Sequence, residues 1–274
     1  MSLYRGMDQA ALDSAYNNIA AVADSARILA DWERRSAVLA AAYPNYLDLR
    51  YGSRDRNRLD FFPGDRGTPL FVFIHGGYWQ MRAKETFRFL AAGPLAHGIN
   101  VANVGYTLAP EATLREIVTE IETAITWAAA NLARHGADRR RLHVGGWSAG
   151  GHLTAMTLAH PAVSGGLAIS GIFDLEPIRL SFLNEKLALD AADVEGLSPA
   201  ARLPQSSAPL TIAYGTAELP ELERQSREYA AARAAASLPG KVVALPGHNH
   251  FTILEELANP EGALTGLVLE LMAT

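Results

Sequence analysis

Residues 142–153 read Leu142-His-Val-Gly-Gly-Trp-Ser-Ala-Gly-Gly-His-Leu153, an apolar run that passes through a glycine-flanked serine. The central G-x-S-x-G pattern places Ser148 where a nucleophilic serine belongs, provided that a strand turns sharply into a helix at this point. The pattern predicts that context, with a strand over 141–145 and a helix over 149–159. A helix N-terminus beside the hydroxyl adds a partial positive charge. In the alternative interpretation, Ser148 only caps the helix.

Strands and helices alternate on both sides of this turn. We expect strands at 46–51, 58–62, 70–74, 99–104, 166–170, 209–214 and 241–245, and helices at 85–97, 114–134, 222–236 and 262–272. Such alternation predicts an α/β fold with a mostly parallel central sheet and helices on both faces. Thr113 is the expected N-cap of the helix that follows it.

Two further segments complete the expected organisation of the chain. Residues 8–42 carry apolar residues at helical spacing and predict an N-terminal helical segment. Residues 175–204 are too long for a simple connection, so we expect a small helical cap insertion over the sheet. No repeat or linker divides the chain, and 1–274 is interpreted as one domain.

The composition excludes several classes of function. The chain has 274 residues, a net charge of −5 and no cysteine. This acidic balance, without a block of Lys or Arg, argues against nucleic acid as a partner. The uncharged stretch 142–173 is broken by glycine pairs and Pro161, so we expect no membrane segment. A polar N-terminus without a signal pattern predicts a cytoplasmic protein. The oligomeric state stays open, and a homodimer is compatible with the sequence.

A second glycine-rich segment, His75-Gly-Gly-Tyr-Trp79, follows the apolar strand 70–74. Backbone N–H groups can stabilise the negative charge that develops on a carbonyl oxygen during acyl transfer. The expected oxyanion donors are the N–H groups of Gly76, Gly77 and Ala149. His75 precedes the glycines, and we expect it to brace this loop rather than to act as a base.

Three aromatic side chains flank these turns. Tyr78 and Trp79 follow the glycines, and Trp147 precedes the serine. We expect them to line the substrate pocket, since pockets are commonly walled by aromatic residues. Ordinary core packing is the alternative for Tyr78 and Trp79.

The base and the acid are expected late in the chain. His250 lies in a loop after the last predicted strand and is the preferred base, with His248 as the alternative. Glu218 is the first carboxylate after the strand 209–214, and a carboxylate is needed to orient the base. Glu221 and Glu223 are interpreted as a solvated helix face. The order Ser148, Glu218, His250 is the one expected for a strand–serine–helix hydrolase.

No cofactor or metal is expected. Without cysteine, zinc and iron–sulfur sites would depend on other ligands, and His248 and His250 have no third ligand nearby in sequence. His152 follows the serine by one helical turn, and its role is left open. In the cap, Asn184 and Asp190 could contact substrate, but a capping or surface role is the simpler interpretation.

Several of these motifs together resemble a known family. They are His75-Gly-Gly-Tyr-Trp79, Tyr106-Thr-Leu-Ala-Pro-Glu111, Gly146-Trp-Ser-Ala-Gly-Gly-His-Leu153, Ser170-Gly-Ile-Phe-Asp-Leu175, Glu218-Leu-Pro-Glu-Leu-Glu-Arg-Gln-Ser226 and Asn249-His-Phe251. In them the chain resembles the alpha/beta-hydrolase superfamily, in the branch near kynurenine formamidase (arylformamidase) and the hormone-sensitive-lipase-like esterases. Two positions depart from the relatives: the acid is Glu218 where several have Asp, and Trp147 stands where His is common.

The resemblance implies a serine hydrolase that acts through an acyl-enzyme on a small ester or amide. It implies Ser148 as nucleophile, Glu218 as acid and His250 as base. The first expectation is arylformamidase activity, in which N-formyl-L-kynurenine is hydrolysed to L-kynurenine and formate. The alternative is a carboxylesterase for small acyl esters, and a more remote one is a non-catalytic ligand-binding member of the fold.

Overall fold

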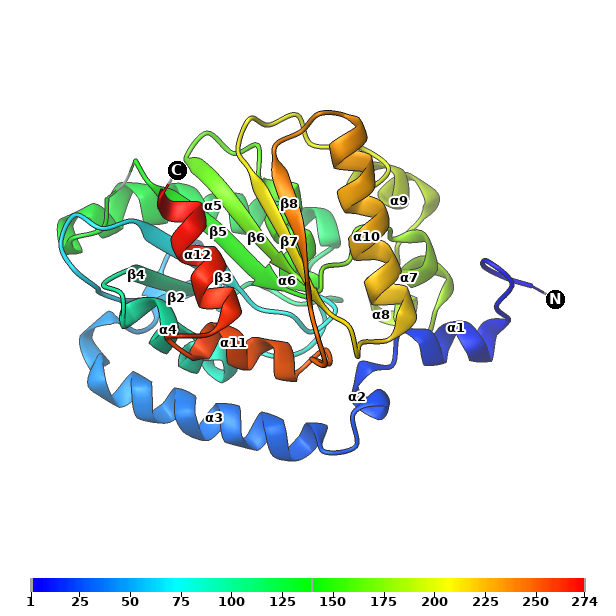
Figure 1. Cartoon of the computed structure of the whole chain (residues 1–274), viewed down its shortest axis with the longest axis horizontal. Helices are drawn as coiled ribbons and strands as arrows, with labels where there is room; N and C mark the ends of the chain where they lie inside the picture. Colours follow the sequence, from blue (N-terminus) through cyan, green and yellow to red (C-terminus); the bar gives the residue numbers. More distant parts are fainter. Residues whose placement is uncertain (1, 139, 274) are drawn as a thin grey trace.

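An eight-stranded sheet forms the centre of the computed structural model, which describes residues 2–138 and 140–273 (Figure 1). The strands are β1 (Leu49–Arg50), β2 (Arg58–Phe62), β3 (Leu70–Ile74), β4 (Asn100–Val104), β5 (Leu142–Trp147), β6 (Val163–Ile169), β7 (Leu210–Gly215) and β8 (Gly240–Leu245). They lie in the order β1-β2-β4-β3-β5-β6-β7-β8. The pairs β1–β2 and β2–β4 are antiparallel and the other pairs are parallel, as the alternating pattern predicted.

Helices cover both faces of this sheet. They are α1 (Gln9–Ala15), α2 (Asn18–Ala21), α3 (Ser25–Ala42), α4 (Ala92–Leu95), α5 (Leu114–Asn131), α6 (Ala149–Thr157), α7 (Glu176–Leu180), α8 (Asn184–Leu187), α9 (Ala191–Leu197), α10 (Pro220–Ala235), α11 (Glu255–Ala258) and α12 (Ala263–Ala273). Figure 1 shows α3, α11 and α12 on the near side of the sheet and α5 and α6 behind it. Among the described residues, no helix is both long and apolar enough to cross a membrane.

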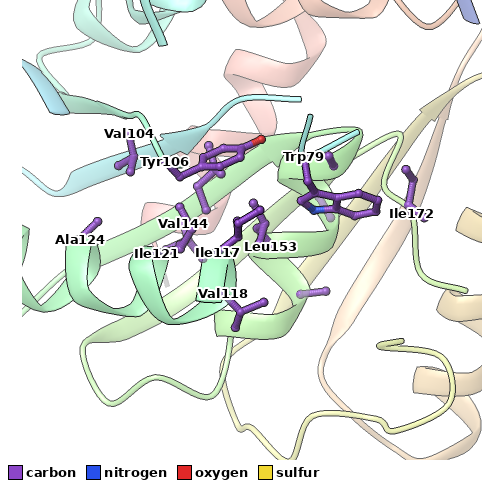
Figure 2. Close-up of a cluster of buried hydrophobic side chains, with 14 of the residues drawn as sticks. Trp79, Val104, Tyr106, Ile117, Val118, Ile121, Ala124, Val144, Leu153 and Ile172 are labelled. Carbon is purple, nitrogen blue, oxygen red and sulfur yellow. The ribbon is translucent and has the colours of Figure 1, made fainter. Parts of the chain in front are cut away.

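Each face of the sheet packs its own core, because successive side chains of a strand point to opposite faces. In β3, Leu70, Val72 and Ile74 belong to one buried cluster, whereas Phe71 and Phe73 belong to the other. The first cluster packs beneath α5, α6 and α10, and Figure 2 shows part of it around Leu153. The second packs beneath α3, the 3-10 helix η2 (Lys84–Ala91) and α12. A continuous apolar strand is therefore required here.

Three predicted elements differ in detail from the structure. The helical segment 8–42 is divided into α1, α2 and α3. The predicted strand 46–51 shrinks to the two residues of β1, because a 3-10 turn, η1 (Pro44–Tyr46), precedes it. The predicted helix 85–97 is a 3-10 helix, η2 (Lys84–Ala91), followed by the single turn α4. Proline in a helix interior removes a backbone hydrogen bond, and Pro94 therefore prevents one continuous α-helix.

Short helices occupy the segment interpreted as a cap. Helices α7, α8 and α9 lie between residues 176 and 197, beside the first helix of the chain (Figure 1). Asn184 bonds through its side chain to both the N–H and the carbonyl of Leu189. Asp190 caps α9 in a reciprocal capping box with Asp193. Both polar residues therefore hold local turns, as the simpler interpretation expected. Two further 3-10 turns, η3 (Leu132–His135) and η4 (Thr252–Leu254), complete the described elements.

Buried histidines should make folding stability depend on pH. Burial lowers the pKa of His75 to about 3 and that of His152 to about 4, whereas histidine in an unfolded chain titrates near 6.5. Between these values the unfolded chain binds protons that the folded chain cannot accept. The free energy of unfolding should thus have its full value above about pH 6.5 and should fall as the pH decreases towards about 4.

Urea unfolding at several pH values in this window measures the effect. His152→Gln, which can still donate to the carbonyl of Leu197, should make the dependence on pH shallower. An unfolding free energy that is constant across the window contradicts this account of the two histidines.

Candidate active site

Ser148 occupies the sharp turn between β5 and α6. Its backbone has φ of 58° and ψ of −117°, a conformation that non-glycine residues rarely adopt. The N–H of Ser148 donates to the carbonyl of Ile169 at 2.8 Å, which helps to hold the turn. A Cβ on Gly146 would lie 2.3 Å from the carbonyl oxygen of Gly150, and one on Gly150 would lie 2.0 Å from that of Ile74. Both flanking positions therefore require glycine.

Glu218 and His250 form a buried pair beside this turn. Nδ1 of His250 lies 2.9 Å from Oε2 of Glu218. The other carboxylate oxygen accepts from the hydroxyl of Ser170 at 2.5 Å and from the N–H of Gly215 at 2.7 Å. A carboxylate only accepts hydrogen bonds, so the pairing places the histidine proton on Nδ1 and leaves Nε2 available. The structure thus brings together the predicted acid and the predicted base.

Two neighbours position this pair. Ser170 directly follows β6 at a φ of 49° and is fully buried. Sequence reasoning did not assign it a role, although its place after a parallel strand, at the same sheet edge as Ser148, was the available signal. Trp147 donates from Nε1 to the carbonyl of His250 at 2.8 Å, and the two rings lie 4.7 Å apart. The tryptophan therefore also fixes the loop that carries the histidine.

Ser148 and His250 line one small cavity of about 120 Å³. Its walls come from five places: residues 16–19 at the N-terminus, the loop after β3, the turn from β5 to α6, residues 182–183 of the cap, and the loop after β8. Within the described residues, the Ser148 hydroxyl makes no hydrogen bond with another group. The Ser148 hydroxyl is thus free to react, and it lines the same cavity as an imidazole that a carboxylate orients.

The predicted oxyanion residues lie at the same sheet edge. Gly76 and Gly77 follow β3, and Ala149 is the first residue of α6. A Cβ on Gly76 would lie 3.0 Å from Cβ of Ser148, so this backbone directly adjoins the serine. Gly77 lines the cavity with a φ of 116°. The three N–H groups are therefore candidates for binding an oxyanion.

The predicted aromatic walls separate into two groups. Tyr78 and Trp147 line the cavity. Trp79 does not: it is fully buried in the cluster that Figure 2 shows. Its ring packs edge to face on His152 with ring centroids 4.9 Å apart. The expected pocket role of Trp79 is therefore wrong, because its backbone, with φ of 58°, carries the side chain into the core beneath α6.

The other histidines take structural positions. His75 donates from Nδ1 to the carbonyl of Gly76 at 2.7 Å and stacks on Tyr106. This is the bracing contact that the sequence suggested. His248 lies 3.5 Å from Glu256 and does not reach Glu218. Nε2 of His152 bonds to the carbonyl of Leu197, which joins α6 to the end of α9.

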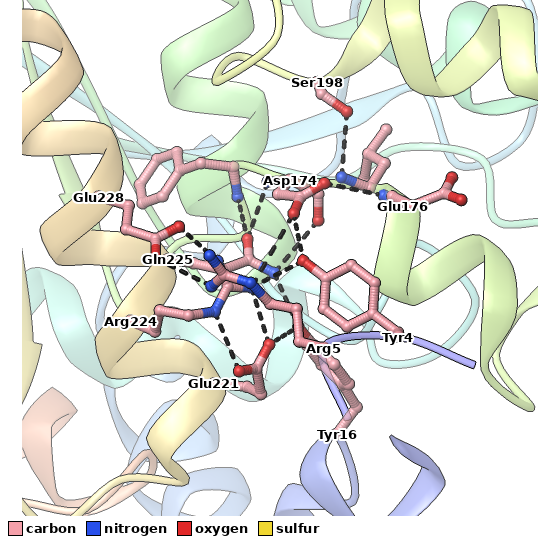
Figure 3. Close-up of polar contacts among 12 residues, drawn as sticks. Tyr4, Arg5, Tyr16, Asp174, Glu176, Ser198, Glu221, Arg224, Gln225 and Glu228 are labelled. Atoms are coloured by element: carbon pink, nitrogen blue, oxygen red, sulfur yellow. Dashed lines mark hydrogen bonds and ion pairs between the residues drawn. The ribbon is translucent and has the colours of Figure 1, made fainter. Parts of the chain in front are cut away.

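A polar cluster ties the N-terminal segment to α10 (Figure 3). The hydroxyl of Tyr16 donates to Glu221 at 3.0 Å and accepts from Gln225 at 2.9 Å. Tyr4 donates to Asp174 at 2.7 Å. The interpretation of Glu221 as a solvated residue is therefore wrong, since Tyr16 and Arg224 both cover it. This cluster holds residues 16–19 over the cavity.

Comparison with known proteins places this geometry among hydrolases. The family model BD-FAE matches residues 62–163. Kynurenine formamidase of Danio rerio is 30% identical over 242 residues, which cover 82% of this chain and 81% of that protein. The Salmo salar kynurenine formamidase is 31% identical over 246 residues, with the same two shares covered.

A solved structure is also similar over nearly the whole chain. A thioesterase candidate from Silicibacter sp. TM1040 is 32% identical, with a TM-score of 0.85 and with 94% of this chain and 98% of that chain covered. With the sheet order described above, these comparisons confirm the alpha/beta-hydrolase fold that the sequence predicted.

Replacement of Gly76 by alanine should destabilise the protein. The added Cβ would lie 2.6 Å from Cε3 and 2.7 Å from the carbonyl oxygen of Trp147. Overpacking of this kind lowers the free energy of unfolding by about 1–3 kcal/mol. Gly266→Ala is the matched control, because nothing lies within 4 Å of its added Cβ. That helical substitution should stabilise by about 0.5–1 kcal/mol. Equal unfolding free energies of the two variants in urea would refute the close approach at Gly76.

Proposed function

The chain belongs to the kynurenine formamidase family and is a hydrolase, and from that premise we propose that it acts through an acyl-enzyme on Ser148. Its preferred reaction is the hydrolysis of N-formyl-L-kynurenine to L-kynurenine and formate. One observation carries the proposal: the buried Glu218–His250 pair opens onto the same cavity as an uncommitted serine hydroxyl. A serine becomes a good nucleophile when such a base is positioned beside it.

The reaction follows from the roles of these groups. Nε2 of His250 takes the proton of Ser148 as its Oγ attacks the formyl carbon. Glu218 stabilises the imidazolium that forms, and the N–H groups of Gly76, Gly77 and Ala149 are the oxyanion donors. The imidazolium then protonates the departing aniline nitrogen, and a formyl-enzyme remains. His250 next removes a proton from water, which attacks the formyl ester and releases formate and Ser148.

The size and rim of the cavity support a small acyl group with an aromatic leaving group. The volume of about 120 Å³ lies below that of usual drug-sized ligand pockets. Ile19 and Phe182 line it and are 48% and 41% exposed, so they form an apolar rim in contact with solvent. A formyl group is the smallest acyl group, and an aromatic ring fits an apolar rim.

A carboxylesterase for small acyl esters is the second candidate. The similar Silicibacter structure is described as a thioesterase candidate, which favours acyl transfer from leaving groups other than aniline. The same nucleophile, base and donors serve both reactions. The two candidates therefore differ in the leaving group that the cavity walls select.

Removal of the proposed nucleophile tests the shared mechanism. Ser148→Ala should lower kcat for N-formyl-L-kynurenine and for p-nitrophenyl acetate by about 10⁴-fold or more, with substrate binding retained. A fluorophosphonate probe should label the unmodified protein at this serine and leave the variant unlabelled, as read by peptide mass spectrometry. Ser164→Ala, a change at a solvent-exposed hydroxyl on the opposite end of β6, is the control and should retain activity and labelling. Undiminished turnover in Ser148→Ala rules out the mechanism.

The dependence of turnover on the size of the acyl group tests the preferred reaction. Because the cavity is small, kcat/KM should be largest for N-formyl-L-kynurenine and should decrease through N-acetyl and N-butyryl analogues by about tenfold or more per step, as overpacking grows. Steady-state assays of the three amides beside p-nitrophenyl formate, acetate and butyrate measure this preference. Turnover of the esters alone would remove the formamidase proposal and retain the esterase.

A further inference from the structure

Arg82 is a cavity residue whose charge is not paired. It lies in the loop after β3 and lines the cavity together with Ser148 and His250. Among the described residues, no side chain or carbonyl forms a hydrogen bond or a salt bridge with its guanidinium. Arginine presents five donors, so this group has a full hydrogen-bonding capacity to offer to a ligand.

The backbone conformation and the neighbouring loop hold Arg82 in a defined position. Its backbone has φ of 76°, a left-handed conformation that costs a non-glycine residue free energy and persists where the surroundings impose it. A Cβ on Gly77 would lie 2.9 Å from Cγ of Arg82, so the arginine stem passes directly over the proposed oxyanion loop. Burial lowers the pKa of this guanidinium, and the attraction of exposed Glu33 only partly opposes that effect.

The cavity offers no anion to this cation. None of its lining residues is an aspartate or a glutamate, and Arg82 is the only arginine or lysine among them. Glu218, the proposed acid, has a fully buried side chain that already bonds to His250, Ser170 and Gly215. The charge of Arg82 is therefore free to complement a negative group on a ligand.

Two other residues of the cavity lining, Asn18 and Tyr78, are already bonded to each other and to the protein. The single proton of the Tyr78 hydroxyl is donated to the carbonyl of Tyr16 at 2.8 Å. That hydroxyl must then accept from Nδ2 of Asn18, at 2.9 Å, which orients the amide. Oδ1 of Asn18 is left without a partner among the described residues. An acceptor-only oxygen repels a carboxylate, so this oxygen does not compete with Arg82 for a negative group.

We propose that Arg82 binds a carboxylate on the leaving-group part of the substrate, so that this site selects substrates that carry a carboxylate there over those that lack one. The inference deepens the proposed function and rests on it. In the proposed complex, the formyl group lies at Ser148 and the amino-acid part of the substrate extends towards Arg82. A planar guanidinium can bind a carboxylate through two parallel hydrogen bonds, which gives both affinity and orientation.

Binding can be measured without turnover. In the Ser148→Ala background, isothermal titration calorimetry compares N-formyl-L-kynurenine with its carboxamide, which keeps the ammonium group and replaces the negatively charged carboxylate by a neutral amide. The acid should bind about 30- to 100-fold more tightly than the amide, as expected for a partly buried charge-assisted pair. Adding Arg82→Gln should reduce this preference to about threefold or less, and Arg82→Lys should retain part of it.

A matched control separates the local contact from net charge. Arg27→Gln removes the same charge from a side chain that is 75% exposed and paired with Asp24. This control should leave the preference unchanged. In the catalytically intact protein, Arg82→Gln should raise KM for the acid with a smaller change in kcat, since the carboxylate is bound equally in the ground and transition states.

The outcomes distinguish this inference from the function on which it rests. If the acid is hydrolysed but its preference over the amide is absent, or survives in Arg82→Gln, the role of Arg82 is overturned and the hydrolase proposal stands. If the preference is present and depends on Arg82 but the acid is not hydrolysed, the binding site is supported and the formamidase reaction fails.

Discussion

The hydrogen bonds of the Glu218 carboxylate hold the candidate site together. One oxygen accepts from His250, and the other accepts from Ser170 and Gly215. These partners come from the ends of β6 and β7 and from the loop after β8. A buried carboxylate is costly unless its oxygens are paired, so the three strand ends must meet in one arrangement. The imidazole is thereby oriented before any substrate arrives.

The sheet topology explains why the serine is present at the same place. β3 lies between β4 and β5. The chain therefore runs from β3 to β4 on one side and later forms β5 on the other side of β3. Ligands of α/β proteins bind at such a switch point, outside the carboxyl ends of the strands. The loop with Gly76 and Gly77 leaves β3 here, and Ser148 leaves the adjacent β5. Parallel pairing therefore brings the proposed nucleophile, oxyanion donors and base to one edge although they are distant in sequence.

Local patterns were sufficient for the sheet and for the positions of Ser148, Glu218 and His250 at one edge of it. The apolar strand 70–74, the capping box at Thr113 and the glycine-flanked turn each depend on neighbouring residues, and each is observed. The pairing of Glu218 with His250 could also be expected, because each directly follows a parallel strand. Trp79 could not be placed correctly, since its burial depends on a left-handed backbone and on distant His152.

What the sequence could not provide are the long-range contacts that shape the cavity. Nothing near Tyr16 indicates that it meets Gln225, or that Asn18 meets Tyr78. Yet these contacts seat the N-terminal segment on the catalytic edge and narrow the space above Ser148. The nucleophile, the acid and the base are the part that formamidases and esterases can share, because both reactions need the same proton transfers. Choice among substrates must therefore come from the residues that surround these groups, where Arg82 adds a cation to an otherwise largely apolar lining.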